Sequence, residues 1–342
     1  PFYDELIFSA KASNNINIIG RFISENKPSN KYYNYLNALL AYHSNKYSEA
    51  VNILKDTNEF EPLYLLSYSY RGLGDYENAL SVLKRSESFL SDKDKSRIYV
   101  SAGSLYLLSN QYNEAQNYYK KGFETAKAFG NRREEINSLI NLAILNDQDG
   151  LVNEAKQKLE SALMISRSIE NQELEATTLS ELAVSYTYSG NVVESKNNYE
   201  ESYKIFKAIN HKERLSNLCA NIASLYLQTA NYSSALEYYN TGLNYAGENL
   251  FSKILNLRGL GDVYSNLSNY SKSLYYYEEA KKLSLNIKDV SLQTSIDVSI
   301  GTLYYNVNKP IRALQFFLDA EKNIDPVSDP YSAENVFFKI GM

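Results

Sequence analysis

The chain has 342 residues, 44% of them hydrophobic, and a formal net charge of -5 at pH 7. That charge is small for the length and no basic stripe is present, which argues against a nucleic-acid-binding surface. No apolar run reaches the ~18 residues of a membrane span. The single cysteine, Cys219, excludes an internal disulfide bond and leaves the redox compartment open.

The first predicted elements are two short helices at 2–12 and 16–25, joined around residues 13–15. We interpret residues 1–30 as a degenerate helical hairpin that packs over the exposed N-terminal end of the helices that follow it. Pro28 then breaks the chain before a new helix begins. Because the sequence starts at Pro1 and not at Met, we expect either a fragment or a removed leader.

The most informative stretch is 136–171, where apolar residues recur at helical spacing on both sides of Gly150. Small Ala143 lies on the first apolar face, and small Ala155 lies on the second, followed by Leu159. Glycine permits a left-handed turn between the two helices. The pattern predicts a helical hairpin, which buries its apolar face only when copies stack on either side of it.

Copies of this hairpin recur through residues 31–325 with a period near 40 residues. Each second helix carries a small residue: Ala50, Ala79, Ala115, Ala155, Ser195, Ala235, Ser273 and Ala313. Twelve residues earlier, each first helix carries another small residue, called its anchor residue: Ala38, Ser67, Gly103, Ala143, Ala183, Ala223, Gly261 and Gly301. Four residues after the second small residue comes a large one: Leu54, Leu83, Tyr119, Leu159, Tyr199, Tyr239, Tyr277 and Phe317.

This order of small, aromatic and turn residues resembles the tetratricopeptide repeat (TPR) family. The second unit carries the pattern most completely: Ser67, Tyr70, Gly74, Tyr76, Ala79 and Leu83. The resemblance implies an all-α fold, a right-handed α-solenoid of tandem helix-turn-helix repeats, with eight repeats over 31–325. The departures are Asn146 in place of an aromatic residue, Asn37 in place of a large apolar one, and a period longer than the usual ~34 residues. The longer period is similar to the arrays of bacterial sensor kinases and LuxR-type regulators.

The last repeat has Pro310 at the start of its second helix, where the missing N–H costs nothing. Residues 326–342 are predicted to begin a further repeat or a C-terminal helix, with Ser332 capping a helix over 333–342. That helix carries Phe337 and Phe338 and lacks the polar outer face expected of a terminal repeat. We therefore expect the protein to continue past Met342 or to pair there, a homodimer through this helix being one form of pairing.

The sequence contains no arrangement of residues suited to catalysis. His43 and His211 lie in separate repeats without a second ligand at metal-binding spacing, and Cys219 occupies an apolar core position. Gly259 and Gly261 lie inside a predicted helix, so they do not form a phosphate-binding loop. We predict that the protein is not an enzyme, with no catalytic residue, no metal site and no cofactor.

In the TPR family the first helix of each repeat lines a concave face, and the resemblance implies a protein or peptide ligand there. The residues mapped to that face are Asn137, Asn141, Gln148, Thr177, Ser180, Tyr188, Asn217, Asn221, Gln228, Arg258, Asp262, Asn266, Tyr305 and Asn306. This face is neutral and rich in amides, which pair with a peptide backbone without demanding charge.

Asn141 and Asn221 lie two residues before their anchor residues, as in repeats of the kinesin light chain type. The resemblance implies contact with the backbone of a bound peptide. Alternatively, these amides bond between neighbouring helices or to water. Arg258 alone has the character of a residue that clamps a terminal carboxylate, so capture of a peptide's C-terminus is disfavoured.

The sequence therefore predicts a protein- or peptide-binding sensor or scaffold module. The favoured context is the regulatory part of a bacterial signalling protein, either a two-component sensor or a transcriptional regulator. The alternative is a stand-alone peptide receptor or assembly scaffold with no output domain. We expect no nucleic-acid binding by this chain, and the location stays open between the bacterial cytoplasm and, for a sensor ectodomain, the periplasm.

Overall fold

The computed structural model of the chain describes residues 17–26, 30–287, 290–324 and 330–341. These residues form helices and the turns between them, with no strand in the described ranges. The chain divides into two compact units, Pro1–Ser138 (unit 1) and Leu139–Met342 (unit 2). The boundary falls inside one helix, α9 (Arg132–Gln148). The fold class predicted from the sequence, an all-α array of tandem helical hairpins, is confirmed.

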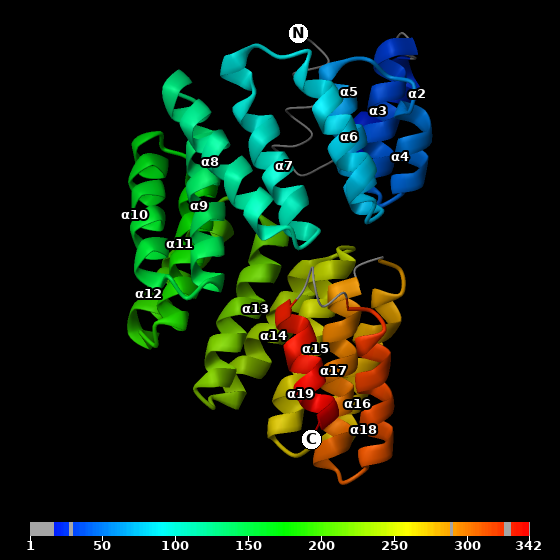
Figure 1. Cartoon of the computed structure of the whole chain (residues 1–342), viewed down its shortest axis with the longest axis vertical. Helices are drawn as coiled ribbons and strands as arrows, with labels where there is room; N and C mark the ends of the chain where they lie inside the picture. Colours follow the sequence, from blue (N-terminus) through cyan, green and yellow to red (C-terminus); the bar gives the residue numbers. More distant parts are fainter. Residues whose placement is uncertain (1–16, 27–29, 288–289, 325–329, 342) are drawn as a thin grey trace. The chain divides into compact units, whose positions relative to one another are not determined.

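Unit 1 contains one short helix, three hairpins and the first turns of α9 (Figure 1). Its elements are α2 (Asn17–Asn26), α3 (Asn30–His43), α4 (Tyr47–Leu54), α5 (Phe60–Gly72), α6 (Tyr76–Glu87), the 3-10 turn η1 (Asp92–Asp94), α7 (Ser96–Leu108) and α8 (Tyr112–Phe129). The predicted helix over 2–12 lies outside the described residues, and the predicted helix over 16–25 is α2.

Unit 2 contains the rest of α9 and ten further helices in its described ranges. They are α10 (Val152–Ser168), α11 (Gln172–Tyr188), α12 (Val192–Ala208), α13 (Lys212–Gln228), α14 (Tyr232–Ala246), α15 (Leu250–Asn266), α16 (Tyr270–Ser284), α17 (Val290–Asn306), α18 (Pro310–Glu321) and α19 (Pro330–Gly341). From α3 to α18, odd-numbered helices are the first helices of the hairpins and even-numbered helices are the second.

The longer repeat period is taken up by longer helices. In the closely spaced second repeat, α5 has 13 residues and α6 has 12. Each of the helices α10 to α13 has 17 residues. The extra residues add about one turn to each helix of a hairpin.

The turn predicted at Gly150 is confirmed, with a left-handed φ of 76°. The N–H of the next residue, Leu151, donates to the carbonyl of Asn146 at 2.7 Å. This bond reaches back five residues and satisfies a carbonyl that the end of α9 leaves without a helical partner. The same bond joins Asn191 to Tyr186 after the left-handed Gly190.

The small anchor residues let the large residues of the second helices pack directly against the first helices. Gly103 demonstrates the need, because a Cβ there would lie 2.7 Å from the ring of Tyr119. A Cβ at Gly261 would likewise collide with the ring of Tyr277. Tyr119 and Tyr277 are both buried. Glycine is needed at these two anchor positions because the aromatic ring of the next helix occupies the space that a Cβ would take.

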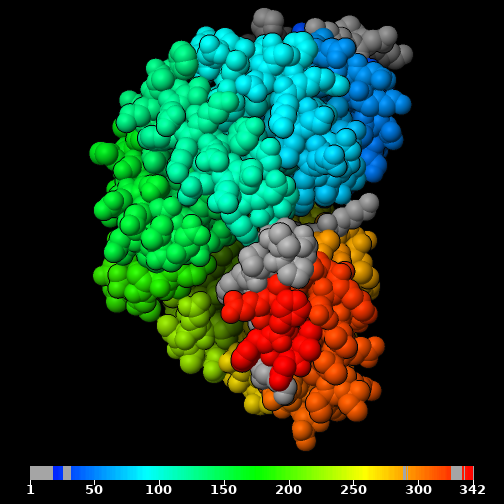
Figure 2. Space-filling model, viewed as in Figure 1, coloured from blue at the N-terminus to red at the C-terminus, as the bar shows by residue number. Residues whose placement is uncertain are grey.

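The C-terminal helix begins earlier than predicted. Helix α19 starts at Pro330, so Ser332 lies inside the helix and is not its cap. Proline suits the first helical position because its N–H would have no partner there. Pro310 is confirmed as the first residue of α18. Figure 2 shows α19 on the surface of unit 2, and its Phe338 is 67% exposed. Pairing of α19 with a further segment or a second copy remains a prediction.

Candidate binding surface

In unit 2, three polar residues occupy the same position on successive first helices. Asn141 on α9, Glu181 on α11 and Asn221 on α13 each lie two residues before the anchor residue of their helix. All three side chains are partly buried. We call these three residues the amide–carboxyl row. The side chains of Asn141 and Asn221 both donate and accept hydrogen bonds, and that of Glu181 does so when it is protonated. The three groups recur at the same position of successive first helices.

The other residues predicted for this face differ in exposure. Partly buried or buried ones are Asn137, Thr177, Ser180, Asn217, Arg258 and Asp262. Exposed ones are Gln148, Tyr188, Gln228, Asn266, Tyr305 and Asn306. Asn217 bridges neighbouring first helices, since its Oδ1 accepts from Ser252 Oγ at 2.8 Å. Thr177 and Asn266 bond to carbonyls of their own helices.

Glu181 makes the first-helix side of unit 2 sensitive to pH. Burial raises the pKa of its carboxyl group to about 7; nearby Arg214 opposes the rise, and Asp147 adds to it. Burial also raises the pKa of Asp147, although Ser185 Oγ donates to its Oδ1 at 3.0 Å. The sequence predicts a neutral surface here. The structure adds two partly buried carboxyl groups, on Glu181 and Asp147, whose pKa values are raised by burial.

Arg258 is held in contacts within unit 2. Its Nη1 donates to Ser295 Oγ on the next first helix at 2.9 Å. Close by, Tyr277 donates its hydroxyl hydrogen to Asp262 Oδ1 at 2.6 Å. Burial raises the pKa of Asp262, against the opposing effects of Tyr277 and Arg258. Arg258 and Asp262 thus belong to one polar cluster between α15, α16 and α17.

In unit 1, a hollow of about 390 Å³ opens on three first helices, α5, α7 and α9. We call it the arginine–tyrosine hollow, and its lining residues are Tyr64, Tyr68, Arg97, Val100, Ser101, Ser104, Arg133, Glu134 and Asn137. The guanidinium carbon of Arg97 lies 3.9 Å from the centre of the Tyr64 ring. The Tyr64 hydroxyl lies 2.6 Å from Ser101 Oγ and 3.0 Å from the Tyr68 hydroxyl. The hollow therefore presents a fixed cation and a connected group of hydroxyls.

Two groups of this hollow, the Tyr64 hydroxyl and the Arg97 guanidinium, keep their protons across the physiological range because the pKa of each is raised. Burial raises the pKa of the Tyr64 hydroxyl far above its ordinary value. Burial acts to lower the pKa of the Arg97 guanidinium, but Tyr64 and Glu61 raise it by more, so the pKa ends above its ordinary value. Tyr64 remains a neutral donor and Arg97 a cation.

Among the residues predicted as binding residues, Asn137 alone lines this hollow. The others that line it were missed, yet the same register finds most of them. Arg97 lies six residues before its anchor residue, as Asn137 and Asn217 do. By the same register, Ser101 corresponds to Asn141. The positions predicted for the fourth repeat, counted from its anchor residue, can be transferred to the second and third repeats. They then give Tyr64, Tyr68 and Ser104 as well.

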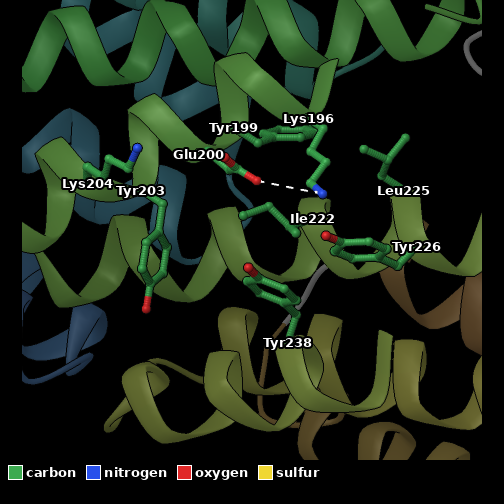
Figure 3. A pocket seen from close by; sticks show the side chains of 9 residues that line it. All are labelled: Lys196, Tyr199, Glu200, Tyr203, Lys204, Ile222, Leu225, Tyr226 and Tyr238. Atoms are coloured by element: carbon green, nitrogen blue, oxygen red, sulfur yellow. Dashed lines mark ion pairs between the residues drawn. The ribbon is translucent and has the colours of Figure 1, made fainter. Parts of the chain in front are cut away.

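A second hollow, of about 140 Å³, lies in unit 2 between the second helices α12 and α14, with α13 contributing (Figure 3). We call it the tyrosine hollow, and its lining residues are Lys196, Tyr199, Glu200, Tyr203, Lys204, Ile222, Leu225, Tyr226 and Tyr238. The rings of Tyr226 and Tyr238 stack with centroids 5.6 Å apart. Lys196 Nζ lies 3.8 Å from Glu200 Oε1, the ion pair drawn in Figure 3. Ile222 and Leu225 are core residues, so this hollow is an edge of the core.

Other reactive groups have structural roles. Cys219 is completely buried, and burial raises the pKa of its thiol to about 12. His211 precedes α13, and its Nδ1 accepts from the N–H of Arg214 at 3.4 Å. Within the described ranges, no group of three histidine, cysteine, aspartate or glutamate residues is arranged to hold a metal ion. Across the same part of the chain, no helix combines the length and apolar character needed to cross a membrane.

Comparison with known proteins identifies the repeats. One tetratricopeptide repeat model matches residues 174–248, and another matches 60–88 and 96–129. No curated protein matches the sequence.

Solved structures share the fold at low sequence identity. A Rap protein complexed with Competence and Sporulation Factor is similar with a TM-score of 0.70 and 15% identity over 97% of each chain. The apo form of RapI has a TM-score of 0.55 and 14% identity over 77% of this chain and 98% of its own. A Signal Transduction ATPase with a tetratricopeptide repeat sensor from Pyrococcus horikoshii has a TM-score of 0.56 and 18% identity, over 99% of this chain and 53% of its own.

Proposed function

Since this chain is a tetratricopeptide repeat protein, we propose that it binds a peptide, or an extended segment of a partner protein, along its first helices. The fold is typical of proteins that bind other proteins and not of catalysts. The observation that carries the proposal is the arginine–tyrosine hollow, because successive first helices line it from equivalent positions of the repeat.

The amide–carboxyl row of unit 2 supports the same proposal. Packed helices lie about 10 Å apart, and three residues of an extended peptide span about the same distance. Asn141, Glu181 and Asn221 thus match the backbone of a bound peptide at about every third residue. Amide side chains both donate and accept, so they pair with backbone groups whatever the peptide sequence.

The finer proposal is a regulatory role in a bacterial signalling protein, either a two-component sensor or a transcriptional regulator. Two of the similar folds support it: the Rap protein complexed with Competence and Sporulation Factor, and the repeat sensor of the Signal Transduction ATPase. A stand-alone peptide receptor or assembly scaffold is the alternative. The coding region on either side of this sequence separates them, because a kinase or DNA-binding sequence there favours the regulatory role.

The direct test is an array of synthetic octapeptides of random sequence, attached through their N-termini and probed with the full chain. Octapeptides that bind are then labelled with fluorescein, and their affinity is measured by fluorescence polarisation. We expect Asn221→Ala to weaken binding about tenfold, since each lost hydrogen bond costs about 1–1.5 kcal/mol. Asn240→Ala is the matched control, because Asn240 is exposed on the second helix α14 and bonds only to its own helix. Equal effects of the two variants would contradict the proposal.

A further inference from the structure

Among the described residues, four repeats join their two helices through a packed pair of aromatic rings near the turn. The first ring lies three residues after the anchor residue, and the second ring lies twelve residues after the first. A ring pair of this kind contributes stability beyond the apolar surface that it buries. The pairs, with centroids 5.1 to 5.6 Å apart, are Tyr106–Tyr118, Tyr226–Tyr238, Tyr264–Tyr276 and Tyr304–Phe316.

The fourth repeat has two polar residues at these positions, Asn146 on α9 and Lys158 on α10. With its amide oriented to satisfy both of its groups, Asn146 donates to the carbonyl of Leu142 at 3.1 Å and accepts from Lys158 Nζ at 3.0 Å. When such a contact opens, both side chains regain hydrogen bonds to water, whereas an opened ring pair exposes apolar surface. The contact across the turn of the fourth repeat is therefore weaker than a ring pair.

The side of α10 that faces the fifth repeat is also held by a polar residue. Lys156 Nζ lies 5.4 Å from the centre of the Tyr186 ring on α11, a weak cation–π contact. The sixth repeat has Leu236 at the equivalent position, packed against the core cluster that contains Leu260 and Val263 of α15. The sixth repeat thus holds the start of its second helix, α14, through apolar contacts on two sides.

The start of α10 lacks a capping bond as well. The residue before the helix is Leu151, whose side chain accepts no hydrogen bond from the first turn. The equivalent residue of the sixth repeat is Asn231, whose Oδ1 accepts from the N–H of Ser234 at 3.2 Å and stabilises the start of α14. The left-handed φ of 56° at Ala230 is a strain that Gly150 avoids, so it offsets part of this difference.

Hydrogen bonds to the fifth repeat hold the rest of the fourth. Asp147, near the end of α9, accepts from Ser185 Oγ on α11 at 3.0 Å. Near the end of α10, Arg167 donates to Glu175 on α11 at 2.7 Å and to Glu201 on α12 at 2.8 Å. The weakly held part of this hairpin is therefore its turn and the start of α10.

We propose that residues 149–158, the turn and the first turns of α10, open locally while α9 and the end of α10 stay folded. Opening of this kind exposes backbone amides to solvent without global unfolding. It gives unit 2 a joint at which the two helices of one hairpin separate near their turn. The inference does not depend on the proposed peptide binding, because no residue of the amide–carboxyl row lies in the segment.

The test is native-state hydrogen exchange of the full chain, measured by mass spectrometry of overlapping peptides. The amides of Ala155 and Ala235 are matched, because each donates at 3.0 Å to the carbonyl of the residue that precedes its helix. After correction for the exchange rates of unfolded peptides, we expect Ala155 to exchange at least about tenfold faster than Ala235. Equal rates would overturn the proposal.

Leu151→Asn tests the missing cap. Leu151 is 47% exposed, so the substitution leaves the core unchanged and adds the acceptor that Asn231 supplies in the sixth repeat. We expect the exchange of Ala155 to slow about fivefold. The rate at Ala235 should stay the same. An equal change at Ala235 would mean that global unfolding sets both rates, and local opening would be wrong.

The double substitution Tyr226→Asn with Tyr238→Lys tests the ring pair, because it copies the polar pair of the fourth repeat into the sixth. We expect Ala235 to exchange at least about tenfold faster, with no change at Ala155. Circular dichroism melting checks that this variant folds. If the rates at Ala155 and Ala235 rose together, or if neither changed, the ring pair would not control local opening and the proposal would be wrong.

Discussion

The two hollows are both walled by tyrosines, but different helices line them. The arginine–tyrosine hollow of unit 1 opens on first helices, and Arg97 lies over a tyrosine ring at 3.9 Å. The tyrosine hollow of unit 2 opens between second helices, and Lys196 lies 6.0 Å from the ring of Tyr226. Its floor is formed by core residues.

This difference teaches that aromatic residues alone do not make a binding site in this fold. Tyrosine fills the large core position of four repeats, at Tyr119, Tyr199, Tyr239 and Tyr277, so a tyrosine-walled space can form at the edge of the core without serving a ligand. A site for another molecule needs oriented donors and acceptors as well, and the repeat register directs these to the first helices. Substitutions in the two hollows should therefore separate stability from binding.

The largest effect is expected from Ile222→Ala beneath the tyrosine hollow. Ile222 is 5% exposed, and removing its buried methyl groups should lower the free energy of unfolding by about 3–4 kcal/mol. Urea denaturation measures this loss. Met164→Ala is the control, since Met164 is 69% exposed on α10. Below the unfolding transition, octapeptide affinity should be unchanged; a tenfold loss would mean that the tyrosine hollow binds peptide.

Glu181→Gln should produce the next largest effect and sharpen the contrast between the first-helix surfaces of the two units. The pKa of Glu181 is raised from 4.5 to about 7, so the folded state binds its proton more tightly. The resulting stability is complete below about pH 4.5 and is lost as the pH rises through about 7. Relative to Glu181→Gln, the unchanged protein should lose about 2–3 kcal/mol between these limits.

The measurement is the free energy of urea unfolding at about pH 5 and about pH 8. Glu154→Gln is the control, because Glu154 is exposed on α10. A pH dependence shared by the unchanged protein and Glu181→Gln would show that the Glu181 carboxyl does not titrate in this range.

Tyr64→Phe tests the hydroxyl group of the arginine–tyrosine hollow. The substitution leaves Ser101 Oγ without its 2.6 Å partner and should cost about 1–2 kcal/mol of stability, measured by thermal and urea unfolding. Tyr112→Phe should cost less than about 0.5 kcal/mol, because the exposed Tyr112 hydroxyl bonds to Asn110 at 3.3 Å. If the two substitutions lowered the free energy of unfolding equally, the hydrogen bonds of the Tyr64 hydroxyl would not stabilise the hollow.

The smallest effect is expected from Lys196→Met at the rim of the tyrosine hollow. The Lys196–Glu200 pair is 3.8 Å long, and both side chains are about half exposed. Such pairs contribute under about 0.5 kcal/mol. Neither the unfolding free energy nor the octapeptide affinity should change measurably. A clear loss of affinity would overturn the distinction between the hollows.

The sequence predicted the hairpins because their determinants are local. Gly150 terminates α9 through its own φ angle, and Pro310 begins α18 through its fixed ring. The anchor residues at Gly103 and Gly261 are also readable, since each pairs with an aromatic residue at a constant interval. The start of α19 was misplaced because Ser332 was predicted to be its cap, although Pro330 is also well suited to a first helical position.

The candidate site was predicted less completely. The register that selected Asn137 also leads to Arg97, but the face residues were predicted only from the fourth repeat onward. The state of Glu181 was beyond sequence reasoning, because its pKa depends on burial among residues of other helices. The contact of Asn217 with a ligand stays a prediction, and its hydrogen bond from Ser252 on the next first helix could not be predicted, because it depends on how the helices pack.

The most direct measurement is photo-crosslinking of a binding octapeptide that carries benzophenone at successive positions, with the crosslinked residues identified by mass spectrometry. For each binding octapeptide, the account predicts crosslinks on first helices, either on α5, α7 and α9 around the arginine–tyrosine hollow of unit 1 or on α11 and α13 along the amide–carboxyl row of unit 2. Crosslinks concentrated on α12 and α14, around Tyr203 and Tyr238, would contradict it.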